Sequence, residues 1–107
     1  MDDEALLVAE TYRQNEIGVM ESVRVVRAVW VSVQSVSRTE FYRAGQAGLQ
    51  PSMVLTTPAV NYDGEEEVIY HGKHYAVYRT YQPPDSDEME LYLQPKTGVT
   101  YGEQMQT

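Results

Sequence analysis

A period-two pattern of apolar residues from Val23 to Ser35 constrains the fold more than any other feature of the sequence. Valines occupy most of the odd positions, with Arg27 as the interruption, and the even positions include Val26, Ala28 and Trp30. Side chains of a β-strand alternate between its two faces, so this spacing predicts one long strand with an apolar face. Its second face is partly apolar and should be covered along part of its length, by a helix or by a partner.

The nine tyrosines and many valines favour strands, and together with turn signals they predict a mainly β domain of about six strands. Asp63-Gly64 is typical of a two-residue hairpin turn, and His71-Gly72 predicts a second tight reversal. Pro58 cannot donate a ladder hydrogen bond, so its strand should be bulged or lie at an edge there. The further strands are expected at Glu4–Tyr12, Met53–Tyr62, Glu65–Tyr70, Lys73–Gln82 and Glu88–Gln94.

One segment departs from the period of two and predicts a short helix. Ser37 and Glu40 have the spacing of a capping box, in which the serine oxygen accepts from the backbone N–H of Glu40 and the glutamate reaches back. Gly45 and Gly48 limit the helix to two or three turns, and Pro51 prevents its resumption. The predicted fold is a small six-stranded antiparallel β-barrel or sandwich with a single α-helix between the second and third strands.

Length and composition indicate one domain. A chain of 107 residues with 42% hydrophobic content builds one core, and residues 1–107 are therefore assigned to a single domain. Residues 1–3 and 96–107 lack a clear pattern and are expected to be flexible. The sequence has no cysteine, which excludes thiol chemistry, thiolate metal sites and disulfides.

The charge balance bears on partners. A formal net charge of -8 repels phosphate backbones, which argues against a nucleic-acid-binding protein. No apolar run has the length of a membrane span and the start is acidic, so we expect a soluble, unexported protein without a membrane partner. Residues 22–50 are net basic, whereas the flanking segments are acidic. This distribution suits head-to-tail packing of identical copies, although a mixed solvated surface explains it equally well.

No arrangement of residues indicates catalysis. His71 and His74 straddle a predicted turn and lack a third ligand at a motif distance, so zinc binding is not expected. The acidic runs flank turns, where they are usually solvated. Gly45-x-x-Gly48 lacks the lysine of a phosphate-binding loop. We therefore predict a protein that is not an enzyme and that has no cofactor, metal site or catalytic residue.

Two groups of residues are candidates for packing or binding. Aromatic side chains on the strands and the helix are expected in the core or at interfaces, where amphipathic rings suit half-buried positions. The segment from residue 43 to residue 52 is small and polar and is expected to be a functional loop, its alternative being a plain connector. The aromatic candidates are Trp30, Phe41, Tyr75, Tyr78 and Tyr81, and the segment candidates are Arg43, Gly45, Gln46, Gly48 and Gln50.

Several segments together are similar to a known family. Val33 to Pro51 reads SVSRTEFYRAGQAGLQP from Ser35 on, and it is followed by Tyr62-Asp63-Gly64-Glu65, by IYHGKHYAVYRTY from Ile69 to Tyr81, and by ELYL from Glu90 to Leu93. In order and spacing these segments resemble the head-tail joining proteins of tailed bacteriophages and prophages, also called head-closure or stopper proteins. The resemblance covers about residues 28 to 98.

This resemblance implies a β-barrel or sandwich with one helix, assembled in the virion as a homohexameric ring below the portal. The implied partners are other copies of the chain, the head-tail adaptor, and a tail terminator or tail-tube protein, and the isolated chain can be a monomer. Double-stranded DNA would pass through the lumen without sequence-specific binding, and an acidic lumen favours passage over sticking. In such a ring the segment from residue 43 to residue 52 is expected to face the central channel or a neighbouring subunit. The implied function is to retain packaged DNA and to dock the tail, in a virion protein made in the bacterial cytoplasm.

An alternative from another class stays open at this point. A small monomeric β-barrel can bind a peptide or a sugar along an exposed strand edge or groove. Size separates the two hypotheses, because a ring sediments as an assembly whereas a binding module stays monomeric with a defined pocket.

Overall fold

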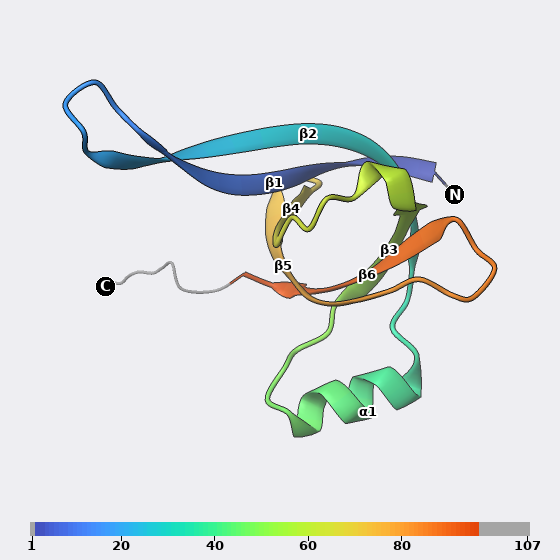
Figure 1. Ribbon diagram of the computed structural model, residues 1–107. Helices are drawn as coiled ribbons and strands as arrows, with labels where there is room; N and C mark the ends of the chain where they lie inside the picture. Colours follow the sequence, from blue (N-terminus) through green and yellow to red (C-terminus); the bar gives the residue numbers. More distant parts are fainter. Residues whose placement is uncertain (1, 97–107) are drawn as a thin grey trace.

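The chain forms a closed six-stranded antiparallel β-barrel with one α-helix between the second and third strands, as predicted (Figure 1). The structure is a computed structural model that describes residues 2–96. Around the barrel the strands follow the order β1-β2-β3-β6-β5-β4. The elements are β1 (Asp2–Gln14), β2 (Met20–Gln34), α1 (Arg38–Gln46), β3 (Met53–Pro58), the 3₁₀ turn η1 (Ala59–Asn61), β4 (Glu67–Tyr70), β5 (Lys73–Tyr81) and β6 (Glu88–Pro95).

The first two strands are longer than the barrel that they help to close. β1 pairs with β4 only over Leu6–Val8, and β2 pairs with β3 only over Ser32–Gln34. The two strands pair with each other over their whole length, out to Gln14 opposite Met20. Residues 10–24 therefore project from the barrel as a two-stranded ribbon, which we call the arm (Figure 1).

The core lies inside the barrel and is built by the alternation of its strands. Leu7 and Val31 of the first two strands meet Leu55, Leu91 and other apolar side chains from the rest of the barrel. On the predicted apolar face of β2, Val29 and Val31 are thus buried inside the barrel. The predicted long strand forms, and at its arm end the apolar face is exposed, with Val25 50% exposed, because β2 leaves the barrel there. The complete core is Ala5, Leu7, Val29, Val31, Leu55, Val68, Tyr75, Leu91 and Leu93.

The tight reversal predicted at His71-Gly72 forms as expected. His71 and Gly72 both have positive φ and join β4 to β5 in a two-residue hairpin with Tyr70 opposite Lys73. The hairpin predicted at Asp63-Gly64 is wrong, because β3 and β4 are not neighbours in the barrel.

The region around Asp63 instead forms a compact connection. The β3 strand ends at Pro58, whose nitrogen has no hydrogen to donate, and η1 follows. The Glu65 carboxylate accepts from the backbone N–H of Asp63, and the Tyr62 hydroxyl donates to the Glu65 carbonyl. These side-chain contacts hold a turn that glycine spacing alone does not distinguish from a hairpin.

The ends of the described chain belong to the barrel. Residues 2 and 3, expected in a flexible end, lie in β1, and the Asp3 carboxylate accepts from the Tyr70 hydroxyl at 2.7 Å. Lys96 follows β6 directly, and its backbone N–H donates to the His74 carbonyl. The rest of the expected flexible tail, 97–107, lies outside the described residues.

Candidate functional site

The candidate segment from residue 43 to residue 52 is only partly a loop. Arg43, Gly45 and Gln46 lie in the last turns of α1. Gly48 then reverses the chain with a φ of +83°, and the backbone N–H of Leu49 donates to the Ala44 carbonyl. This is the usual glycine closure of a helix, so the expected loop is reduced to the residues after Gln46.

The end of that segment is tied to β6. The backbone N–H of Gln50 donates to the Gln94 side-chain oxygen at 3.0 Å, and that of Ser52 donates to the Leu93 carbonyl at 2.8 Å. These bonds hold the end of the segment against β6, on the side of the barrel where α1 lies (Figure 1). Its assignment to a channel or a neighbouring subunit stays a prediction.

A polar cluster attaches α1 to the barrel. Ser37 caps the helix as predicted, its hydroxyl accepting from the backbone N–H of Glu40 at 3.1 Å. The returning half of the capping box is wrong, because in the described residues the Glu40 carboxylate accepts from the Tyr78 hydroxyl at 2.6 Å and from Arg79 at 2.7 Å. The guanidinium of Arg79 in turn lies 3.9 Å from the ring centroid of Tyr92.

A register shift in β5 makes this cluster possible. Val77 pairs with Leu93 and Arg79 pairs with Tyr92, so Tyr78 is the extra residue of a β-bulge. In a regular strand Tyr78 and Arg79 would point to opposite faces, whereas here both reach Glu40. Burial by itself raises the pKa of Glu40, but the Arg79 and Tyr78 hydrogen bonds outweigh it and lower that pKa. Burial beside this carboxylate raises the pKa of Tyr78.

The aromatic candidates divide between core and surface. Tyr75 is buried in the core and Tyr78 is half-buried under α1. A core position is wrong for Trp30, Phe41 and Tyr81, which are 66%, 56% and 45% exposed. Phe41 is exposed because α1 contacts the barrel through Glu40 and Ala44, on another side of the helix. An interface role for the exposed rings stays a prediction.

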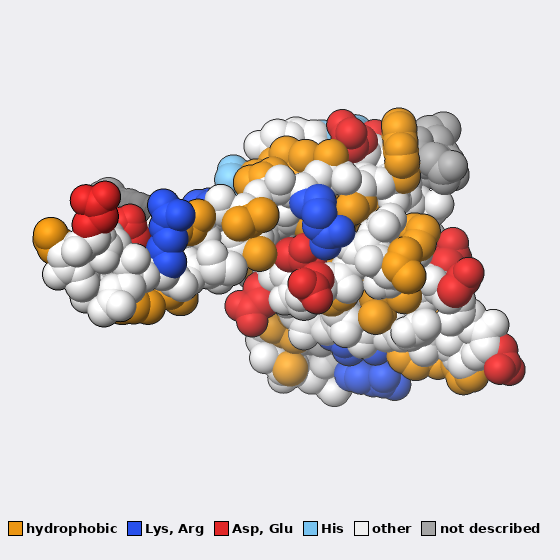
Figure 2. Space-filling view, turned by 45° about the horizontal axis from the view of Figure 1, so that its top comes forward, with side chains coloured by type: hydrophobic (Ala, Val, Ile, Leu, Met, Phe, Trp, Pro, Cys, Tyr) orange, Lys and Arg blue, Asp and Glu red, His pale blue; other side chains and the backbone are white. Residues whose placement is uncertain are grey.

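The arm is a feature that the sequence interpretation missed. Apolar side chains at its tip and along its strands face solvent, and Figure 2 shows hydrophobic side chains at the tip and on the lower edge of the projecting part. Asn15 closes the turn by accepting from the N–H groups of Ile17 and Val19. The exposed apolar residues of the arm are Tyr12, Ile17, Val19 and Met20.

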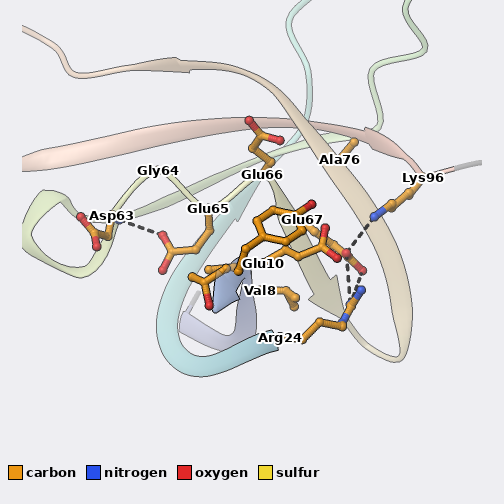
Figure 3. A pocket seen from close by; sticks show the side chains of 13 residues that line it. Val8, Glu10, Arg24, Asp63, Gly64, Glu65, Glu66, Glu67, Ala76 and Lys96 are labelled. Carbon is orange, nitrogen blue, oxygen red and sulfur yellow. Dashed lines mark hydrogen bonds and ion pairs between the residues drawn. The ribbon is translucent and has the colours of Figure 1, made fainter. Parts of the chain in front are cut away.

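A cleft of about 640 Å³ opens where the arm leaves the barrel. Its walls are Val8–Tyr12, residues 63–67, Arg24, Ala76 and Lys96, and Figure 3 shows their side chains. Carboxylates dominate this lining. Figure 3 shows Arg24 and Lys96 bonded to the same carboxylate, that of Glu67, and Asp63 bonded to Glu65.

Three cationic or ionisable side chains surround the Glu67 carboxylate. His74 Nδ1 lies 2.7 Å from one oxygen, Lys96 Nζ lies 2.8 Å from the other, and Arg24 Nη2 lies 3.2 Å from both. Burial raises the pKa of Glu67, but the bonds from His74, Lys96 and Arg24 outweigh it and lower the pKa to about 2. A second buried carboxylate, Glu65, accepts from Arg27 at 2.6 Å.

The two buried carboxylates of the cleft are occupied by these contacts. Glu67 and Glu65 are held by ion pairs, so neither carboxylate is placed as a free base facing the cleft. His71 lies 2.7 Å from the Asp3 carboxylate, whereas His74 lies on Glu67, so the two rings serve different partners. Within residues 2–96, no group of three histidine or acidic side chains is arranged to hold a metal ion.

The comparisons add no family to this description. None of the helices in residues 2–96 combines the length and the apolar composition of a membrane-spanning helix. No protein-family model matches the chain, and no curated protein matches it in sequence.

Proposed function

We propose that the chain is a structural protein of a tailed bacteriophage or prophage, and that it forms a ring joining the DNA-filled head to the tail. The resemblance of residues 28 to 98 to head-tail joining proteins motivates this proposal. The closed barrel with one helix agrees with the fold that the resemblance implies.

The observation that carries the proposal is the display of large apolar side chains on two protruding elements. The barrel buries a complete core of its own, yet the arm exposes Tyr12, Ile17 and Met20, and α1 exposes Phe41 and Tyr42. Soluble monomers rarely display so much apolar surface without a use for it, and such surfaces usually mark protein interfaces. Two such elements suit a protein that must contact neighbours on more than one side.

The proposed partners follow from this role. Copies of the chain would form the ring, the adaptor below the portal would contact one side, and a tail terminator or tail-tube protein would contact the other. The net charge of -8 supports passage of double-stranded DNA without binding, because a ring of acidic subunits repels the phosphate backbone. The protein would then reside in the virion at the head-tail interface.

Deletion of the gene from the phage or prophage that encodes it tests this function. We expect electron microscopy of the lysate to show separate heads and tails, with DNA lost from the heads. Wild-type protein supplied from a plasmid should restore joined particles. Normal numbers of tailed, DNA-filled particles without the protein would contradict the proposal.

The cleft at the base of the arm favours a second candidate, a small monomeric binding module for a peptide or a sugar. Its volume is that of a small-ligand site, and Glu10 and Glu66 contribute exposed carboxylates to its lining. Titration of lysine-rich peptides and of oligosaccharides into the labelled protein, followed by NMR, would detect saturable binding there. A saturable ligand that Glu10→Gln weakens, on a chain that stays monomeric, would favour this candidate.

A further inference from the structure

One face of the β1–β2 hairpin is covered only near the cleft, where Val8 is buried, and its apolar residues on β2 from Val26 to Trp30 are exposed. Glu4 lies opposite Trp30 and Leu6 lies opposite Ala28 on the side that faces away from the core. We call Glu4, Leu6, Val26, Ala28 and Trp30 the outer ribbon face. Val26 and Trp30 are 51% and 66% exposed. The apolar even positions of β2 thus lack the covering layer that their composition requires.

The face of α1 that points away from the barrel is uncovered as well. Residues at spacings of three, four and seven share one side of a helix, so Arg38, Phe41, Tyr42 and Gly45 form a single face opposite the buried Glu40 and Ala44. We call these four residues the outer helix face. Phe41 and Tyr42 are 56% and 66% exposed, and a side chain at Gly45 would meet nothing within 4 Å.

The two faces complement each other in chemistry. The outer helix face carries two aromatic rings and the cation of Arg38, whereas the outer ribbon face carries Trp30, aliphatic side chains and the anion of Glu4. In residues 2–96 neither Arg38 nor Glu4 takes part in an ion pair. An aromatic and basic surface therefore matches an apolar and acidic one.

The two faces also match in length. A helix of nine residues is about 14 Å long. The stretch of β2 from Val26 to Trp30 spans about 14 Å as well. The small residues Gly45 and Ala28 lie within these faces and allow the two backbones to approach closely.

Within one molecule the two faces cannot meet, because α1 lies on one side of the barrel and the β1–β2 hairpin lies across the other (Figure 1). We propose that the outer helix face of one copy packs on the outer ribbon face of a second copy. Because the contact joins two different surfaces, each bound copy offers a free face to the next, and the series can close into a ring. The inference rests on the proposed function in that it supplies the contact by which the proposed ring assembles.

Two variants of the full chain test this contact. Trp30→Ala removes the largest side chain of the outer ribbon face, and Tyr42→Ala removes an aromatic ring from the middle of the outer helix face. Sedimentation of each variant alone should show self-association weakened at least tenfold relative to wild type, as for the anchor residues of interfaces. Tyr81→Ala, which removes another exposed ring outside both faces, is the matched control and should associate as wild type does.

A mixture of the two variants gives the sharpest result. The intact helix face of Trp30→Ala fits the intact ribbon face of Tyr42→Ala, so an equimolar mixture should form a 1:1 complex that does not grow further. A mixture that stays monomeric, or a Trp30→Ala protein that assembles as wild type does, would overturn the proposed contact.

Cysteine cross-linking identifies the contact directly, since the native chain has no cysteine. A short bismaleimide should join Ala28→Cys to Gly45→Cys in a mixture of the two variants, and should join neither to the control Lys73→Cys. A wild-type chain that is monomeric at its highest soluble concentration and gives no such cross-link would also overturn the contact. Gene deletion tests the proposed function separately. If the deletion prevents joining but the cross-link does not form, the function stands and only the proposed contact is wrong.

Discussion

Glu40 contributes to tertiary structure through its carboxylate and to the start of α1 through its backbone N–H. Its N–H is bound by the Ser37 hydroxyl, and its oxygens are bound by Tyr78 and Arg79. The spacing of Ser37 and Glu40 predicted the cap. It did not predict the tertiary contacts, because these depend on the bulge in β5, which no local pattern of residues specifies.

The Ser37 cap makes a stability prediction at the scale of one residue. Ser37→Ala should lower the free energy of unfolding by about 1 kcal/mol, because one N–H at the helix start loses its acceptor. Denaturant unfolding measures the change. Thr39→Ala, an exposed change in the first turn, is the control and should cost less. Equal stability of Ser37→Ala and wild type would show that the cap contributes nothing.

Glu67 makes a pH-dependence prediction. Its pKa is lowered from the ordinary value of 4.5 to about 2 in the folded protein, so its ionised form stabilises the fold above pH 4.5. That contribution should disappear as the pH falls from about 4.5 to about 2. Because the partner side chains of Arg24, His74 and Lys96 are about half-exposed and screened by solvent, we expect Glu67→Gln to cost only about 1 to 2 kcal/mol at pH 7.

Urea unfolding at several pH values checks this behaviour. The difference between wild type and Glu67→Gln should shrink below pH 4.5. Glu66→Gln removes a carboxylate from the exposed neighbouring residue and should change stability little at any of these values. A difference between wild type and Glu67→Gln that is constant from pH 7 to pH 2 would contradict the assignment.

At the scale of elements, two glycines near the end of α1 have opposite roles. Gly48 has a φ of +83°, which a residue with a Cβ adopts with strain, whereas Gly45 lies within the helix in open space. Gly48→Ala should therefore destabilise the fold by about 1 kcal/mol, and Gly45→Ala should stabilise it by about 0.5 to 1 kcal/mol. Thermal unfolding of the two variants measures both signs. The same sign for both would mean that α1 does not close at Gly48.

The packing of the helix gives a further prediction for two aromatic residues. Phe41→Ala should change stability by less than about 0.5 kcal/mol, because the ring is exposed on the outer helix face. Tyr75→Ala should cost about 3 to 5 kcal/mol, because it empties a position in the core. Chemical denaturation distinguishes the two variants. A large loss for Phe41→Ala would place that ring against the barrel.

At the scale of the whole molecule, sequence patterns predicted the barrel better than they predicted its surfaces. Period-two alternation, strand-favouring residues and turn signals together located all six strands, and the glycines and the serine cap located α1. Alternation does not state which strands are neighbours, so the hairpin expected at Asp63-Gly64 proved wrong. It also does not distinguish a face covered by the chain itself from one left open. Trp30 was therefore assigned to core or interface, and the structure leaves it outside the core.

The arm projects from the barrel and contributes no residue to its core. Replacing residues 12–22 by Asn-Gly would join Thr11 to Val23 in a two-residue hairpin turn and would retain Arg24, which binds Glu67. The removed residues lie outside the core, so we expect the free energy of unfolding to change by about 1 kcal/mol or less.

In phage particles the same shortened chain should fold and yet fail to join heads to tails, because the arm carries the exposed apolar residues Tyr12, Ile17 and Met20. A full-length variant with Ile17→Ser and Met20→Ser separates the chemistry of the arm from its length. If the apolar contacts matter, both variants should lower the infectious titre at least tenfold, since lost interface anchors typically cost that much in affinity. A wild-type titre from particles that carry the shortened chain would show that the arm has no part in joining, and would leave the outer ribbon and helix faces as the surfaces to examine.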